Sequence, residues 1–279
     1  MITIKKLIII LAISISIILS GCWIVPEPPN EIVYRALLVG VGDYVGCNSD
    51  LKSPPYNVDR MREIFGMCRF GKEETDFSII NELKDKKATK KAVLDEIWYT
   101  FRDATDDDIS YFYWCGHGTD RYGVYICPAD SDFGDTKTYI SVEELENALD
   151  AIAGTKVIIL EACHSGNFIE KNMEDFNSKV IDIFSHQSIE LNKDSYQVIT
   201  SCAGSQVCWE VGHIDEPYTY FTMAVYQGFL NLSADINEDK VIDLYEIYSY
   251  VQDWVVDNTN KEQATQIYPN GSTFPIVEY

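Results

Sequence analysis

The stretch Lys156-Val157-Ile158-Ile159-Leu160-Glu161-Ala162-Cys163-His164-Ser165-Gly166 determines how the rest of the chain is interpreted. Its apolar residues 157–160 are consecutive rather than alternating, which is typical of a parallel strand buried on both faces. The run ends at Cys163, and a glycine-containing turn follows. Open α/β folds bind their ligands at the carboxyl ends of such strands. We therefore expect Cys163 at the rim of a sheet.

A second stretch of the same form lies upstream. Residues 109–115 have the pattern of another buried strand, and Gly116-His117-Gly118 follow it. If the two strands are neighbours, a thiol and a base come side by side. A thiolate is a nucleophile, and an imidazole can accept the thiol proton and later protonate a leaving amine. The alternative is a buried thiol and a structural histidine, which does not explain the two glycine-containing turns.

The motifs Gly116-His117-Gly118 and Ala162-Cys163-His164-Ser165-Gly166 resemble those of the caspase-like cysteine peptidases, above all the bacterial metacaspase-type branch. The histidine lies 46 residues before the cysteine, close to the caspase spacing. The resemblance extends from about Arg35 to Tyr250. It implies a caspase-like (caspase-hemoglobinase) α/β fold and a Cys163–His117 dyad. It also implies an oxyanion site made by the N–H groups of Gly118 and Cys163, with no cofactor needed for the chemistry.

A competing base is His164. Neighbouring side chains on an extended strand point to opposite faces, so His117 is the predicted partner of Cys163. The glycines beside His117 are expected to leave room for a substrate backbone.

The resemblance also implies a specificity. Metacaspase-type peptidases prefer a basic residue before the cut bond, held by two acidic residues. The first lies two positions before the cysteine, where this chain has Glu161. The second lies in a motif matched by Tyr56-Asn57-Val58-Asp59-Arg60-Met61, where Asn57 takes its place, with Asp59 and Asp50 close by. Ser201 begins the segment that lines the pocket in this family. We therefore expect cleavage after Arg or Lys by a pocket that has lost one acid.

The remaining elements alternate between strand and helix. Residues 35–42, 77–83 and 196–201 have strand patterns, and residues 167–194 are expected to form a surface loop. Helices are predicted after Pro54-Pro55, after the capping residue Thr89, after the Ser141–Glu144 capping box and over 218–230. This order predicts a mostly parallel sheet with helices on both faces.

The N-terminus has the features of a bacterial lipoprotein signal. Two lysines precede an apolar run of 13 residues, Leu7–Leu19, which is the length of a signal-peptide core. Leu19-Ser20-Gly21-Cys22 resembles a lipobox, in which the cysteine is lipidated. The alternative is an uncleaved signal anchor. We predict a signal peptide over 1–21, a proline-rich tether over 22–33 and a peptidase domain over 34–279, held by its lipid in the extracytoplasmic cell envelope.

The charge limits the partners. The net charge is −22, which argues against binding nucleic acid or anionic lipid head groups, so anchoring must come from the lipid. Of the 8 cysteines, six are scattered without a Cys-x-x-Cys pair, and no metal cluster is expected from them.

A Ca²⁺ loop is predicted near the C-terminus. Oxygen ligands stand at positions 1, 3, 5, 9 and 12 of an EF-hand-like loop over 235–246, and position 7 would contribute its backbone carbonyl. Position 6 is Lys240, where the pattern prefers glycine. The alternative is an acidic turn that caps the next helix. The predicted ligands are Asp235, Asn237, Asp239, Val241, Asp243 and Glu246.

These observations predict a lipid-anchored cysteine endopeptidase that acts on protein or peptide substrates. Two other classes stay open. One is an inactive caspase-like scaffold that binds a surface partner through its Ca²⁺ loop, and the other is a thiol hydrolase that acts on other amides or esters. Fast reaction of Cys163 with an electrophile would distinguish an enzyme from the inactive scaffold. Turnover of peptides would distinguish the endopeptidase from the hydrolase of other amides or esters.

Overall fold

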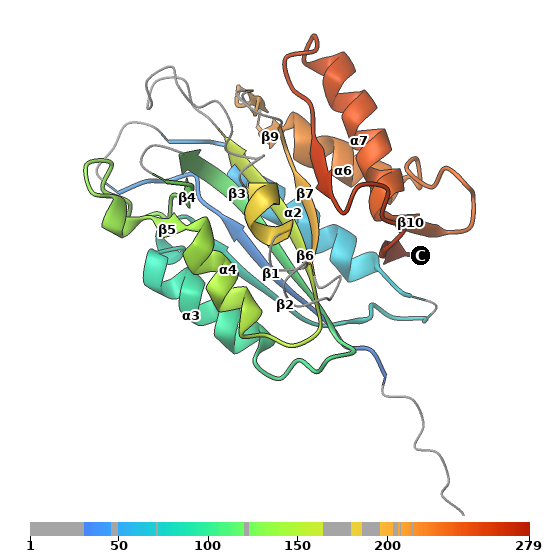
Figure 1. Ribbon diagram of the computed structural model, residues 1–279. Helices are drawn as coiled ribbons and strands as arrows, with labels where there is room; N and C mark the ends of the chain where they lie inside the picture. The colour runs from blue at the N-terminus through green and yellow to red at the C-terminus, as the bar shows by residue number, and fades with distance from the viewer. Residues whose placement is uncertain are drawn as a thin grey trace, which may run out of the picture. The chain divides into compact units, whose positions relative to one another are not determined.

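Five parallel strands form the centre of the sheet (Figure 1). The computed structural model describes residues 31–45, 50–70, 72–119, 123–163, 180–185, 196–202, 206, 208–213 and 215–279, and of Cys163 the backbone only. The parallel strands are β1 (Tyr34–Gly40), β2 (Phe77–Lys84), β3 (Ile109–Thr119), β6 (Thr155–Cys163) and β7 (Tyr196–Thr200). Their order is β7-β6-β3-β1-β2, and β11 (Gln266–Tyr268) adds an antiparallel edge beside β7.

Shorter strands extend this frame. β4 (Tyr125–Ile126) pairs with the end of β3 and with β5 (Ile140–Ser141). The hairpin of β8 (Glu210–Val211) and β9 (Tyr218–Thr219) is separate, as is the pair of β10 (Val241–Asp243) and β12 (Pro275–Glu278). Residues 32–279 form one compact unit.

Helices cover both faces of the sheet, as the strand–helix alternation predicts (Figure 1). One face packs against α2 (Pro54–Met67), α6 (Tyr220–Leu230) and α7 (Leu244–Asn258). The other packs against α3 (Lys90–Phe101) and α4 (Val142–Asp150).

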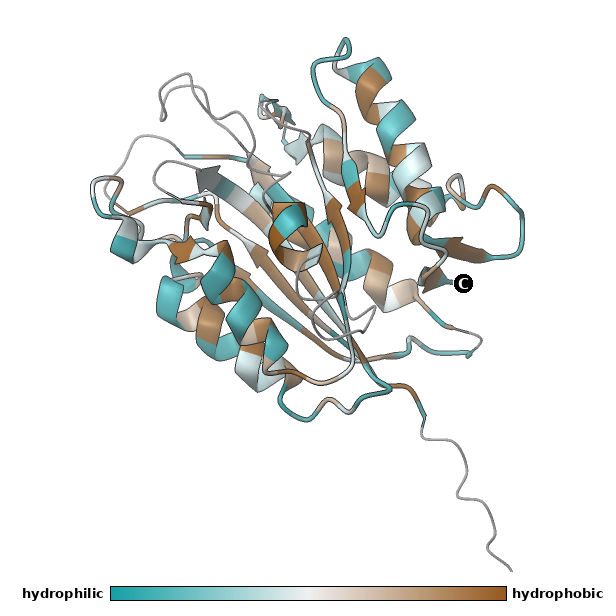
Figure 2. Ribbon diagram, viewed as in Figure 1, coloured by the Kyte–Doolittle hydropathy of each residue, from teal (hydrophilic) through white to brown (hydrophobic). Residues whose placement is uncertain are grey.

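The continuous apolar runs have a simple cause. Successive residues of a strand point to opposite faces. In β6, Val157 and Ile159 belong to one core layer, and Ile158 and Leu160 belong to the other. Because both faces are covered by helices, every position needs an apolar side chain, and Figure 2 shows these central strands in the hydrophobic colour.

The predicted helix starts are confirmed. Prolines occupy the first positions of α2, and the Thr89 side chain accepts a hydrogen bond from the Ala92 amide at the start of α3. Ser141 and Glu144 form the expected capping box of α4. The predicted helix over 218–230 begins two residues later, because Tyr218 and Thr219 form β9.

The predicted surface loop over 167–194 is partly wrong. Residues 180–185 are helical, and Val180 and Phe184 are fully buried in the core layer shared with α3 and α4. Val180 and Phe184 are four residues apart, which is a helical spacing, but the segment around them is polar and gives no further helix signal. In the described part of the chain, no helix has the length and apolar character to cross a membrane.

Candidate active site

The two predicted site strands are direct neighbours. β3 and β6 pair in parallel, and their register places His117 opposite Cys163. The turn predicted at Gly116-His117-Gly118 is wrong, whereas β6 reaches Cys163 as predicted. β3 continues through Gly118 to Thr119, because Gly118 and Thr119 pair with β4, and β6 continues to Cys163. His117 and Gly118 are therefore held by strand hydrogen bonding rather than by a loop.

The imidazole of His117 lies in an aromatic environment. Its ring centroid is 4.7 Å from that of Tyr44 and 6.3 Å from that of Phe133. The backbone N–H of His117 donates a 2.7 Å hydrogen bond to the Tyr44 hydroxyl, and its carbonyl accepts one from the Cys127 amide. The side chain is 4% exposed. The ring is therefore restrained by packing and by the backbone.

Gly116 has a different use from the one predicted. A Cβ at this position would lie 2.9 Å from the Tyr44 hydroxyl oxygen and 3.2 Å from Trp114. The missing side chain thus makes room for Tyr44 rather than for a substrate backbone.

Glu161 is completely buried in a polar group, the Glu161 cluster (Glu161, Tyr113, Cys115, Thr219, Thr222 and Cys208). Its carboxylate accepts hydrogen bonds from the Thr222 hydroxyl at 2.6 Å, the Tyr113 hydroxyl at 3.0 Å and the Cys208 thiol at 3.4 Å. Burial raises the pKa of the Glu161 carboxyl, and these donors together with Thr219 act in the opposite direction. Among the described residues, no cationic side chain pairs with it.

The side chain of Asn57 joins this cluster from α2. Its amide donates to the Thr219 hydroxyl at 2.8 Å and approaches the Cys115 sulfur at 3.5 Å. Its own Oδ1 is buried without a hydrogen-bond partner within the described residues. A buried acceptor of this kind is costly unless a donor reaches it. Glu161 and Asn57, which are distant in sequence, are thus brought together around Thr219.

Asp59 does not join this group. It is exposed on α2 and forms an ion pair with Lys84 of β2, so its inclusion among the substrate-binding residues is not supported by its position. Asp50 accepts the Tyr44 amide. Ser201 is buried, its N–H donates to the Leu160 carbonyl, and its own carbonyl accepts the Gln263 amide. Ser201 therefore belongs to the rim between β6 and β7.

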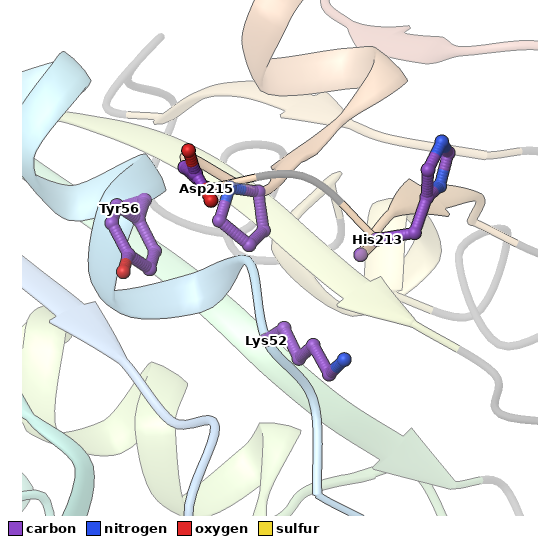
Figure 3. A pocket seen from close by; sticks show the side chains of 6 residues that line it. Lys52, Tyr56, His213 and Asp215 are labelled. Carbon is purple, nitrogen blue, oxygen red and sulfur yellow. The ribbon is translucent and has the colours of Figure 1, made fainter.

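A surface pocket lies beside the start of α2 (Figure 3). It lies between the start of α2 and the turn of the β8–β9 hairpin, with Tyr56 and Asp215 on one side and His213 on the other. Glu210 fixes the two elements, since its Oε2 accepts the Lys52 amide, the Ser53 amide and the Ser53 hydroxyl. The pocket has a volume of about 390 Å³ and is lined by Lys52, Tyr56, Gly212, His213, Asp215 and Pro217.

Two of the described thiols, Cys68 and Cys115, are unsuited to nucleophilic attack. All five described thiols are buried: Cys68, Cys115, Cys127, Cys202 and Cys208. Burial raises the pKa of Cys68 to about 12 and that of Cys115 well above its ordinary value. Buried thiols with raised pKa values are poor nucleophiles.

The predicted Ca²⁺ loop is closed by its own hydrogen bonds. Asp235 accepts the amides of Asp239 and Lys240, and Glu246 accepts those of Ile236, Asn237 and Asp243. Asp243 and Glu246 also form a capping box at the start of α7, which is the alternative reading of these acids. Lys240 adopts φ +70°, a left-handed backbone that usually favours glycine. Across the described ranges, no three His, Cys, Asp or Glu side chains gather closely enough to hold a metal ion.

Several residues around the site could not be found from the sequence. Tyr44, Thr219 and Cys208 lie in segments without a motif, and only the fold brings them to His117 and Glu161. The predicted lipidation site Cys22, the competing base His164 and the side chain of Cys163 lie outside the described residues.

Comparisons with known proteins agree with this architecture. A family model described as "Caspase domain" matches residues 34–276. Metacaspase-1 of Candida albicans and Metacaspase-1 of Lodderomyces elongisporus are 23% and 24% identical to this chain over 157 residues. Each alignment covers 49% of this chain and 34% of the relative, so the chain spans about a third of the length of these relatives.

A solved structure is similar in fold. The crystal structure of protein GSU0716 from Geobacter sulfurreducens matches with a TM-score of 0.58, and the match covers 87% of this chain and 97% of that one. The sequence identity is 15%, so the likeness concerns the fold alone.

Proposed function

The chain belongs to the caspase-domain family, and from this we propose that it is a cysteine endopeptidase with Cys163 as nucleophile and His117 as general base. One observation carries the proposal: the register of β3 and β6 pairs these two residues at the carboxyl ends of adjacent strands. Neighbouring strands lie about 4.8 Å apart, which is within reach of a proton transfer between side chains.

The proposed reaction has two halves. The Cys163 thiol gives its proton to His117, and the thiolate attacks the carbonyl carbon of the peptide bond. The N–H groups of Gly118 and Cys163 stabilise the oxyanion. The C–N bond then breaks as the His117 imidazolium protonates the leaving amine. In the second half, His117 takes a proton from water, and the water oxygen attacks the carbonyl carbon of the thioester left on Cys163. The C–S bond breaks, the acid product leaves, and the imidazolium returns its proton to the Cys163 thiolate.

We assign Tyr44 a positioning role. Its hydroxyl accepts the His117 amide, and its ring packs on the imidazole. A general base contributes only when its ring is held in reach of the proton it moves. Packing against the Tyr44 ring restricts the imidazole of His117 and places no additional charge beside it.

The specificity we propose is for Arg over Lys before the cut bond, with some tolerance of neutral residues and none for Asp. Glu161 supplies one buried negative charge, and the unpartnered Oδ1 of Asn57 supplies a second acceptor in the same cluster. A guanidinium has several donors in a planar fork, so it can bond both groups at once, which an ammonium does less well. Asn57 itself carries no charge, so the preference is shallower than in a pocket with two acids.

The location we propose is the bacterial cell envelope, outside the cytoplasm, with a lipid anchor at Cys22. The sequence before the domain supports this, because a short apolar run ends in a lipobox-like tetrapeptide. The substrates are then proteins or peptides of that compartment, and the net charge of −22 disfavours nucleic acid as a partner.

We also propose a structural Ca²⁺ ion in the loop 235–246. Its support is the ligand spacing and the left-handed backbone at Lys240, which gives position 6 the conformation that glycine usually provides. To bind the ion, Asp235 and Glu246 must exchange their backbone amide partners for the metal. The ion would stabilise the loop and the start of α7 and take no part in the peptide chemistry.

Peptide hydrolysis by single variants tests the proposed function. Cys163→Ala and His117→Ala should each abolish turnover of an Arg-containing peptide, whereas His164→Ala should keep a substantial part of it. Full activity of the His117→Ala protein would contradict the dyad.

A further inference from the structure

The last turn of α3 carries an exposed group of side chains, the α3 aromatic patch (Trp98, Tyr99 and Arg102). Trp98 is 51% and Tyr99 57% exposed, and their ring centroids lie 5.0 Å apart. The Arg102 guanidinium lies 4.8 Å from the Trp98 ring centroid and 5.6 Å from that of Tyr99. Single exposed apolar residues are ordinary, but two adjacent large aromatics held by a cation indicate a binding surface.

The patch lies at the end of the domain where the N-terminal segment enters. The Val33 amide donates to Asp108 Oδ1 at 2.9 Å, and Arg35 pairs with Asp108 at 3.0 Å. Arg35 also donates to the Asp103 carbonyl, and Asp103 directly follows Arg102. β1 and β3 begin side by side, and Figure 1 shows this end of the sheet next to the first described residues of the chain. The proposed catalytic pair stands at the other end of the sheet, on β3 and β6.

We propose that the α3 aromatic patch contacts the surface of the bilayer that holds the lipid anchor, an inference that rests on the anchor proposed at Cys22. The tether over 22–33 is short and rich in proline, and at about 3.1 Å per residue it spans roughly 37 Å. The end of the domain where it enters is therefore kept near the bilayer. Trp and Tyr combine an apolar ring with a polar edge and favour the interface, and Arg102 can reach a phosphate from above the rings.

Charge decides which bilayer suits the patch. Asp103, Asp106 and Asp107 are exposed on the segment that follows α3. These carboxylates are repelled by anionic head groups within about 8–10 Å in physiological salt. The contact must therefore come from burial of the aromatic rings, and it should be strongest on a zwitterionic surface.

The contact would also orient the proposed active site. His117 lies nine positions after Asp108, which is about 30 Å along β3. With the patch on the bilayer, Cys163 and the Glu161 cluster face the aqueous compartment. The peptide bonds that the protein cleaves are then expected to lie away from the membrane surface rather than next to it.

Quenching of tryptophan fluorescence by brominated phosphatidylcholine tests this contact. The full chain, isolated with its anchor, is placed in such vesicles. Trp23 follows Cys22 directly, so quenching of Trp23 shows that the anchor is inserted. The difference in quenching between the wild type and Trp98→Phe gives the part that comes from the patch. Trp209→Phe is the matched control, since Trp209 is also exposed, at 42%, and lies beside Cys208 of the Glu161 cluster at the opposite end.

We expect Trp98→Phe to remove a distinct part of the quenching and Trp209→Phe to remove none. Phosphatidylglycerol added to the vesicles should reduce the Trp98 part. Equal quenching in the wild type and Trp98→Phe, with Trp23 still quenched, would overturn the contact and leave the anchor standing. Absence of any quenching in the wild-type protein would overturn the anchor and the contact together. The outcome of the quenching experiment is independent of whether the protein is a peptidase.

Discussion

Replacing Tyr44 by Phe removes one oxygen atom beside His117 and leaves the aromatic ring in place. The lost hydroxyl accepts the His117 N–H at 2.7 Å, in a region where His117 is 4% exposed. A buried amide without a partner costs about 1–3 kcal/mol. If this cost appears as misalignment of the imidazole in the transition state, kcat falls roughly 5- to 150-fold. KM should stay unchanged, because Tyr44 packs in the core layer on one face of the sheet, whereas Tyr113, Cys115 and Cys208 of the Glu161 cluster pack in the layer on the other face.

Tyr111→Phe is the matched control for this variant. Tyr111 is also fully buried on β3, but its hydroxyl donates to the Ile276 carbonyl, and it lies six residues, about 20 Å, before His117. Both variants should lower Tm by roughly 2–10 °C. Only Tyr44→Phe should lower kcat, measured under saturating peptide well below either Tm. An equal loss of kcat in both variants, or none in Tyr44→Phe, would refute the positioning role.

The remaining predictions concern specificity, the loop and the anchor. Glu161→Gln should erode the preference for Arg over a neutral residue in kcat/KM by roughly 10- to 150-fold, the value of a charge-assisted hydrogen bond, and Asn57→Asp should sharpen it; a preference for Asp would refute the pocket. Burial raises the pKa of Glu161, so kcat/KM for Arg peptides should fall as the pH drops through that raised pKa. Glu161→Gln should remove this fall in kcat/KM for Arg peptides. The pH dependence of kcat/KM for a peptide with a neutral residue at the same position should not change. Millimolar Ca²⁺ should raise the Tm of the wild type but not of Asp239→Ala, in a calorimetric scan, and equal shifts would contradict the Ca²⁺ loop. Cys22→Ser should release the protein from membranes, and mass spectrometry showing an unmodified Cys22 in the mature chain would contradict the anchor.

Much of the fold follows from local patterns in the sequence. Continuous apolar runs identify parallel strands because both faces are covered, and the caps at Thr89 and Ser141 mark helix starts through side-chain hydrogen bonds that are local in sequence. The strand ends are less predictable. Gly118 and Thr119 have no strand signal of their own, and they extend β3 only because β4 returns to pair with them.

The candidate site shows the same division. The pairing of His117 with Cys163 could be anticipated because both motifs end buried strands. The surroundings could not, since Tyr44 meets His117 across 73 residues and Thr222 meets Glu161 across 61. Asp59 illustrates the limit of a motif match. It is two residues from Asn57, but a helix turns adjacent positions by about 100°, and Asp59 faces Lys84 instead.

The rate at which Cys163 is alkylated is the most direct measurement of the central proposal. Iodoacetamide should label Cys163 rapidly near neutral pH, in step with the loss of peptidase activity, while the buried thiols such as Cys68 and Cys115 stay unlabelled in the folded protein. His117→Ala should slow this labelling strongly at the same pH. Labelling of Cys163 at the rate of an ordinary exposed thiol, unchanged in His117→Ala, would contradict the Cys163–His117 dyad.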